Sequence, residues 1–326
     1  MKKLAPLSGK VIPLHQVNRL APTGYGTLLD DWLKRSPSHH TRRVYRSAIW
    51  DFFAAVADGE ATPERLAQFL TLDQPQAFEL VSQYHGQLIE LRLAPATINR
   101  KLAALKSLVS YAAECGKCHY TLTNVKSEKL KPYRDTSGIS SDAFKRMLDA
   151  VDTDTLKGKR DYAILLLLWG NALRRSELVG TNIGDFDPEM GTLRIYGKGR
   201  AGQAETVKLG KGALSAIRDW LNARGETDPN QPLFIAIHKS YYGHRLITHS
   251  IWKLVRKYAL AAGITKPMSP HRIRHSSITA ALDATNGDVR AVQKLSRHSN
   301  LNTLMIYDDN RSNEQGRITD LLDDLV

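Results

Sequence analysis

The stretch "SPHRIRHSS", residues 269–277, places two histidines and two arginines within five consecutive positions. Its first two residues predict a helix start, because serine caps a first turn and proline fits the first helical position. Helical spacing then puts His271 and Arg274 on one face, with His275 beside them. A helix N-terminus also presents unpaired N–H groups and partial positive charge. This concentration of positive charge predicts a bound anion, which we expect to be a phosphate.

A second stretch, "GNALRRSELVG" at residues 170–180, places Arg174 three residues before Glu177. An arginine beside a buried helix needs a partner, and Glu177 can be simply that partner. Alternatively, Arg174 enters a cleft and grips a phosphate with its planar guanidinium, while Glu177 orients it from behind. The residues alone leave both interpretations open.

The chain as a whole is basic. Its 326 residues contain 46 Lys and Arg against 33 Asp and Glu, for a net charge of +13, which favours nucleic acid or an acidic membrane surface as partner. The longest apolar run, "AILLLLW" at 163–169, is far shorter than the roughly 20 residues that cross a bilayer. Proline and glycine interrupt the N-terminal segment, so we expect neither a signal peptide nor a membrane anchor, and a cytoplasmic location.

Amphipathic helices with basic faces are predicted in the first half. One begins near Thr41 and carries an apolar stripe through Phe53, and another begins near Thr97, each threonine being the expected N-cap. A single charge off such a stripe is best explained as a solvated helix face. Together with the net charge, these charges are equally compatible with a DNA-facing surface. The candidate DNA-binding residues are Arg42, Arg43, Arg46, Arg100 and Lys101.

Strands are predicted only in the second half. Residues 192–197 and 203–209 alternate apolar and polar side chains on either side of a glycine-rich turn, which predicts a hairpin with Lys198 at its tip. The segment "QPLFIAI", residues 231–237, is a candidate third strand. The motif "CGKCH", residues 115–119, formally matches a haem attachment site, but further ligands are missing, so we expect two packed thiols at a helix end.

Two further residues complete a pattern. His298 is followed nine positions later by Tyr307, which by itself would be an aromatic core residue. The order R-x-S-E-L, hairpin lysine, H-x-x-R-H, late histidine and tyrosine resembles that of the tyrosine recombinases, the phage integrase family. The resemblance implies the following site, supported by Glu177 and His275: Arg174, Lys198, His271, Arg274, His298 and the nucleophile Tyr307.

The resemblance extends over nearly the whole chain and implies the fold. It is mainly α with a small antiparallel β-sheet, in which a helical, SAM-like core-binding domain precedes a mixed α/β catalytic domain. We expect a flexible arm at 1–24, the core-binding domain at 25–128, a linker at 129–141 and the catalytic domain with a C-terminal helix at 142–326. Three departures stand out: Ala172 and Arg297 occupy positions where the family usually has glycine, and the hairpin turn carries a second basic residue, Arg200, beside Lys198. The first should be tolerated, whereas the second predicts an altered loop beside His298.

The resemblance also implies the reaction. Tyr307, with a reference pKa of about 10, needs a base such as His271, and the departing 5′ oxygen needs an acid, for which Lys198 is the implied candidate. The arginines offset charge that builds on the phosphate, and His298 donates a hydrogen bond to it. The 3′-phosphotyrosyl product stores the bond energy, so the chemistry requires neither ATP nor a metal. No cofactor is expected.

The implied partners are double-stranded DNA and further copies of the chain. An apolar stripe on the acidic tail, 318–325, either folds back on its own domain or docks on a neighbouring protomer, giving a homo-tetramer on two DNA sites. An accessory DNA-bending protein is compatible with this. Two alternatives remain: a type IB topoisomerase with similar chemistry, and a DNA-binding architectural protein with an idle site. The basic helical domain and the tail favour recombination.

Overall fold

The computed structural model describes residues 25–36, 38–57, 59–129, 138–197, 204–298, 301, 304 and 314–325. The chain divides into two compact units, Met1–Tyr133 and Arg134–Val326. Each unit has its own hydrophobic core.

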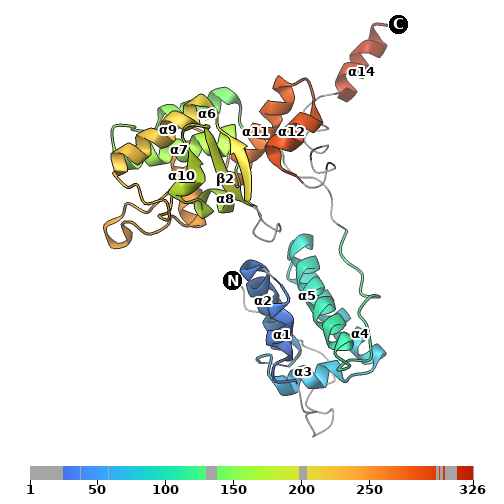
Figure 1. Ribbon diagram of the computed structural model, residues 1–326. Coiled ribbons are helices and arrows are strands. Elements are labelled where there is room, and N and C mark those ends of the chain that lie inside the picture. The colour runs from blue at the N-terminus through green and yellow to red at the C-terminus, as the bar shows by residue number, and fades with distance from the viewer. Residues whose placement is uncertain are drawn as a thin grey trace. The chain divides into compact units, whose positions relative to one another are not determined.

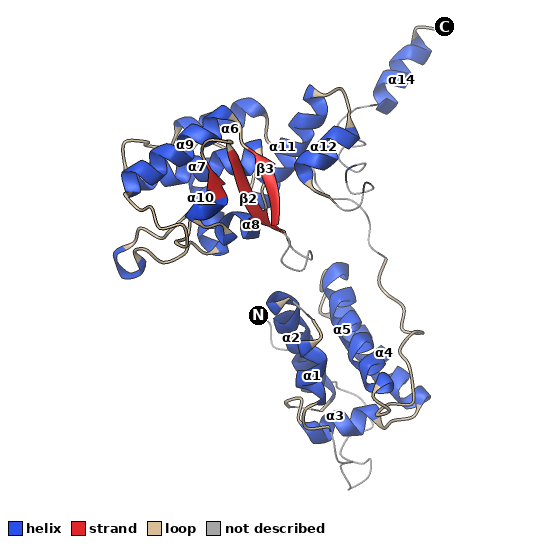
Figure 2. Cartoon of the chain, in the orientation of Figure 1, coloured by secondary structure: helices blue, strands red, loops and turns tan. Residues whose placement is uncertain are grey.

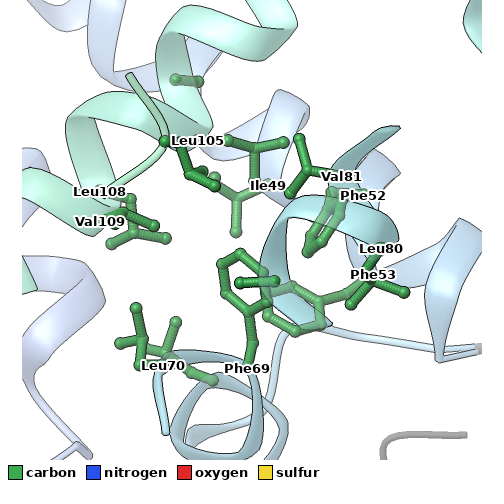
Figure 3. Packing of buried hydrophobic residues seen from close by; sticks show 14 of the residues in the cluster. Ile49, Phe52, Phe53, Phe69, Leu70, Leu80, Val81, Leu105, Leu108 and Val109 are labelled. Atoms are coloured by element: carbon green, nitrogen blue, oxygen red, sulfur yellow. The ribbon is translucent and has the colours of Figure 1, made fainter. Parts of the chain in front are cut away.

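Unit 1 is helical in its described part (Figure 1). Aromatic rings fill its core: Phe52 makes edge-to-face contacts with Phe53, Phe69 and Tyr84, and aliphatic side chains of α5 lie near them (Figure 3). This packing leaves Arg42, Arg43, Arg46 and Arg100 outside the core. The helices are α1 (Leu28–Lys34), α2 (His39–Val56), α3 (Pro63–Leu70), α4 (Gln74–Glu90) and α5 (Pro95–Glu114).

The two expected N-caps of unit 1 are wrong. Helix α2 begins earlier, because the Ser38 hydroxyl accepts a hydrogen bond from the backbone N–H of Thr41 and makes Ser38 the cap. Helix α5 begins at Pro95, with Ala94 as an N-cap residue that makes no side-chain cap bond. Proline at the first helical position is already fixed in φ, and its missing N–H is one of those that would lack a partner within the helix in any case. Thr97 therefore lies inside the first turn.

Unit 2 combines helices with one small sheet (Figure 2). The sheet has the order β1-β2-β3 and is antiparallel throughout, with Thr192 opposite Lys208 and Tyr196 opposite Ala204. The elements are α6 (Ser141–Asp149), α7 (Leu156–Gly170), α8 (Arg175–Gly180), β1 (Phe186–Asp187), β2 (Thr192–Tyr196), β3 (Ala204–Lys208), α9 (Lys211–Arg224), α10 (Thr248–Ala261), α11 (Pro270–Ala284), α12 (Val289–Ser296) and α14 (Glu314–Asp323). Short 3-10 turns cover Ile183–Asp185 and Lys239–Tyr241.

Helix α7 is the centre of unit 2. Ile164, Leu165, Leu167 and Leu168 are fully buried, as expected of the "AILLLLW" run, and the helix packs on α9 and α11. Its C-terminus leads through Asn171 and a turn into α8. Helix α11 packs on both α7 and α12, and Arg274 near its start bonds to the carbonyls of Ala172, just after α7, and Ser296, at the end of α12, so these ends meet in one region. That region holds the candidate site.

The predicted fold class, mainly α with a small antiparallel sheet, is confirmed. The candidate third strand is wrong: β1 fills that place, whereas 231–237 makes only isolated bridges, Pro232 with Asn182 and Ile235 with Arg245. The thiol prediction is half right, since Cys118 is buried and Cys115 is exposed, both free. No helix among the described ranges is long and apolar enough to cross a bilayer.

Candidate active site

Four of the predicted site residues line one cavity in unit 2. Arg174, His271, Arg274 and His298 surround a volume of about 410 Å³. They come from three separate elements: the start of α8, the start of α11 and the end of α12. The cavity lies at the N-terminus of α11, where Ser269 caps the helix and Pro270 occupies its first turn as predicted. Its wall is thus strongly cationic.

Arg174 is held by Glu177. The residue occupies the N-cap position of α8, where its backbone N–H donates to Glu177 Oε2 at 2.9 Å and its Nη1 donates to Oε1 at 2.6 Å. The Arg174 side chain is 35% exposed, whereas that of Glu177 is 1% exposed. The carboxylate is therefore a buried partner of Arg174, as in the first interpretation, and it leaves the guanidinium at the cavity wall, where the second interpretation requires it.

Arg274 approaches the cavity from α11 and is almost fully buried. Its Nη1 donates to the carbonyl of Ala172 and its Nη2 to that of Ser296. The same Nη2 lies 3.3 Å from His298 Nε2. Arg274 thereby ties the turn after α7 to the end of α12, which fixes the position of its own guanidinium.

His271 and His275 form a pair on successive turns of α11. Their Nε2 atoms lie 2.7 Å apart, so one imidazole donates and the other accepts. His271 is exposed and lines the cavity, while His275 is buried. This arrangement places His275 where it can fix the tautomer and ring orientation of His271.

His298 is neutral at physiological pH. Burial, followed by the positive charges of Arg274 and Arg174, lowers its pKa to about 4. A guanidinium N–H can only donate, so in the contact with Arg274 the histidine Nε2 accepts. The single proton of this neutral imidazole is then on Nδ1.

The lowered pKa of His298 predicts acid sensitivity of the fold. The unfolded chain takes up a proton on this histidine below about pH 6.5, whereas the folded chain resists protonation until about pH 4. The contribution of neutral His298 to the free energy of unfolding is therefore fully present above pH 6.5, and it decreases as the pH falls toward 4. After allowance for partial exposure, we expect a loss of about 1 kcal/mol between pH 7.5 and 5.

Urea unfolding at both pH values measures this loss. His298→Gln should reduce it, and His244→Gln, which changes an exposed histidine, should leave it unchanged. An equal loss in the native chain and in His298→Gln would show that the acid sensitivity arises elsewhere.

Two contributors to the site were not predicted. Arg297 was expected to disturb the loop, yet its side chain is buried and donates to Glu177 Oε2 at 2.9 Å, while His298 still reaches the cavity. Trp252 of α10 lines the cavity, with His249 stacked on its ring and the Arg256 guanidinium 4.9 Å from its centroid. The spacing of a histidine, a tryptophan and an arginine on one helix face is the signal that marks this stack.

Lys198 and Tyr307 lie outside the described residues. The described part of the β2–β3 pair ends with Tyr196 opposite Ala204. Among the described residues, no group of three or more histidine, cysteine, aspartate or glutamate side chains is placed to hold a metal ion.

The candidate DNA-binding residues of unit 1 are only partly brought together. Arg43, Arg100 and Lys101 line one open groove of about 590 Å³. Lys101 is also paired with Asp51, which reduces the charge it offers. Of the other two, Arg42 donates to the carbonyl of Ser36 at 2.6 Å, and Arg46 pairs with Asp30 at 3.2 Å.

Comparison with known proteins identifies relatives over nearly the whole chain. The sequence pattern of the phage integrase family matches residues 138–314. The tyrosine recombinase slr0733 of Synechocystis sp. is 52% identical over 299 residues, which cover 92% of this chain and 95% of that protein. A tyrosine recombinase of Synechococcus elongatus is 43% identical, with 97% of this chain and 99% of that protein covered.

Solved structures share the fold at low identity. A XerH site-specific recombinase bound to palindromic difH substrate has a TM-score of 0.61 at 18% identity, covering 98% of this chain and 99% of its own. A lambda integrase dimer bound to a COC′ core site has a TM-score of 0.62 at 14% identity, covering 88% of this chain and 77% of its own.

Proposed function

The chain belongs to the phage integrase family of tyrosine recombinases, and from this premise we propose that it breaks and rejoins double-stranded DNA at a specific site through Tyr307. The observation that carries the proposal is the convergence of Arg174, His271, Arg274 and His298 on one cationic cavity at the N-terminus of α11. A phosphodiester is the anion that such a wall fits, because two guanidiniums and a helix N-terminus all offer N–H donors.

Cleavage would proceed by attack of the Tyr307 oxygen on the scissile phosphorus. The bond from phosphorus to the 5′ oxygen breaks as the tyrosyl–phosphorus bond forms, which leaves a 3′-phosphotyrosyl enzyme and a free 5′ hydroxyl. Arg174 and Arg274 stabilise the charge that builds on the non-bridging oxygens. His298, as a neutral imidazole, lines the cavity without adding charge, and it donates one hydrogen bond to the same phosphate once its ring turns the N–H toward it.

Two protons move in this step. The tyrosine proton passes to His271, whose Nε2–H then donates to His275 Nε2 and leaves Nδ1 as the acceptor. Lys198 supplies the proton for the departing 5′ oxygen. Attack by the 5′ hydroxyl of another strand reverses the sequence and rejoins the DNA. Since the phosphotyrosyl bond conserves the energy of the broken bond, the proposal needs neither ATP nor a metal.

Unit 1 would contribute to DNA binding through its groove. Arg43 and Arg100 are exposed there, and Lys101 lies beside them. We assign these three residues to phosphate contacts. Arg42 and Arg46 are not among the residues that line the groove, and they remain candidates from the sequence.

Recombination of two sites would use a tetramer, assembled through α14. The exposed fractions of Leu321, Leu322 and Leu325 are 56%, 58% and 79%, which is unfavourable in water and favours a partner surface. We propose a neighbouring protomer as that partner, on two DNA sites in the cytoplasm. An accessory DNA-bending protein is compatible with such an assembly.

A trapping experiment distinguishes the proposal from its alternatives. Nicked duplexes of random sequence are incubated with the protein, and the covalently attached DNA is recovered and sequenced. The proposal predicts an adduct enriched in one sequence. Relaxation of supercoiled DNA that lacks this sequence would indicate a type IB topoisomerase, and DNA binding without any adduct would indicate an architectural protein.

A further inference from the structure

Arg297 occupies a backbone conformation that favours glycine. It is the C-cap of α12, with φ 56° and ψ 36°, and its N–H donates to the carbonyl of Gln293 at 2.7 Å. A side chain with a Cβ is disfavoured in this left-handed region, whereas glycine adopts it freely. The arginine side chain must therefore contribute something that glycine does not.

That side chain is 4% exposed and makes contacts with three segments. Nη1 donates to the carbonyls of Asn171 at 3.1 Å and Leu295 at 2.8 Å. Nη2 donates to the carbonyl of Ala172 at 3.3 Å and to Glu177 Oε2 at 2.9 Å. Arg297 thus connects the turn after α7, the end of α12 and the first turn of α8.

These are the segments that carry the site. Ala172 precedes Arg174 by two residues, and Arg297 itself precedes His298. The backbone carbonyl of Arg297 also accepts from Arg174 Nη2 at 3.4 Å. A shift of the Arg297 side chain would therefore move both Arg174 and His298.

The contact with Glu177 also affects the charge at the cavity. Glu177 Oε1 faces Arg174 Nη1, while Oε2 faces both the Arg174 N–H and Arg297 Nη2. With both oxygens engaged, the carboxylate cannot rotate without losing a charged contact. Because one carboxylate serves two guanidiniums, it leaves more of the Arg174 charge for a bound phosphate.

We propose that Arg297 is a positioning residue for DNA cleavage, which acts through Glu177 and the adjoining carbonyls to hold Arg174 and His298 against the scissile phosphate. This inference rests on the proposed function. Arg297 does not touch the DNA, because its side chain is buried and the lining of the cavity is formed by other described residues. The competing explanation is that Arg297 stabilises the fold alone.

The test separates these explanations by the linkage that is cleaved. Arg297→Met removes the charge and the N–H donors but keeps a long side chain. Arg297→Lys keeps the charge but loses the planar guanidinium and its paired N–H donors. Arg290→Met removes an exposed arginine from the same helix as a matched control. Should the methionine variant fail to fold, Arg297→Gly replaces it, because glycine fits the φ of 56°. The substrates are nicked duplexes of the recovered site with a phosphodiester or a neutral methylphosphonate at the scissile position.

The single-turnover rate of adduct formation and the affinity for DNA are measured for each protein variant with each of the two substrates. For Arg297→Met we expect a rate about 10- to 100-fold lower on the phosphodiester, with affinity changed by less than about threefold. On the methylphosphonate, Arg297→Met should lower the rate by about threefold or less, because less charge builds up at the neutral linkage and needs stabilisation. The rate of Arg297→Lys on the phosphodiester should lie between those of Arg297→Met and the native chain. The rate of Arg290→Met should equal that of the native chain.

Equal rates for Arg297→Met and the native chain, or equal losses on both linkages, would overturn the positioning role. A native chain that forms no adduct on the phosphodiester would instead overturn the proposed function. The two failures are therefore distinct.

Discussion

Arg174→Ala is expected to lower the single-turnover rate of DNA cleavage by a factor of about 10²–10³. A preorganised donor aimed at developing charge typically has an effect of this size. The Arg174 guanidinium lines the cavity and is oriented by Glu177, so it meets the condition of preorganisation. Arg174→Lys should retain part of the rate, because an ammonium keeps the charge but cannot form the paired hydrogen bonds of a guanidinium.

The neighbouring arginine provides the control. Arg175 lines the same cavity and is exposed, but it is not held by Glu177. Arg175→Ala removes the same formal charge and should lower the rate by less than about tenfold. Rates are measured on a nicked duplex at saturating protein, with melting temperatures to verify folding. Similar losses in both alanine variants would show that net charge, and not the orientation of Arg174, governs cleavage.

Glu177→Ala should lower the free energy of unfolding of unit 2 by about 3–5 kcal/mol, because it leaves the buried Arg297 guanidinium without its carboxylate. Glu177→Gln should lower the free energy of unfolding by less than Glu177→Ala does, because an amide oxygen still accepts a hydrogen bond from Arg174. Glu189→Ala, which removes an exposed carboxylate from the same unit, should change stability by no more than about 0.5 kcal/mol. Urea unfolding at pH 7.5 measures all three.

The contribution of Glu177 also has a defined pH dependence. Burial by itself would raise the pKa of this carboxyl, but the charge of Arg297 and the hydrogen bonds from Arg174 outweigh burial and hold the pKa below its usual value. Its stabilisation is thus present above about pH 4.5 and is lost as the pH falls through the lowered pKa. The difference in the free energy of unfolding between the native chain and Glu177→Ala should therefore become smaller at acidic pH. A constant difference would contradict this assignment.

The sequence predicted those parts of the site that depend on local chemistry. The capped start of α11 follows from serine, proline and helical spacing, and the pairing of Arg174 with Glu177 follows from their separation within one turn. The buried α7 follows from its composition. Each of these features is decided by residues within about one turn of one another.

The contacts of Arg297 could not be predicted in the same way. Its acceptors at Asn171, Ala172 and Glu177 are more than a hundred positions away in the chain. A sequence pattern records only that glycine is expected at this position, because the backbone is left-handed there. These partners lie within reach of the side chain only where α7, α8 and α12 are brought together by the fold. The strand β1 was not predicted for a different reason: its two residues are too few for an alternating pattern.

The most direct measurement is the chemical identification of the bond between protein and DNA. The adduct trapped on a nicked duplex is digested with protease and nuclease, and the modified peptide is identified by mass spectrometry. The account predicts a 3′-phosphate esterified to the phenolic oxygen of Tyr307, with a free 5′ hydroxyl on the departing strand. Attachment through another residue, or through a 5′-phosphate, would contradict it.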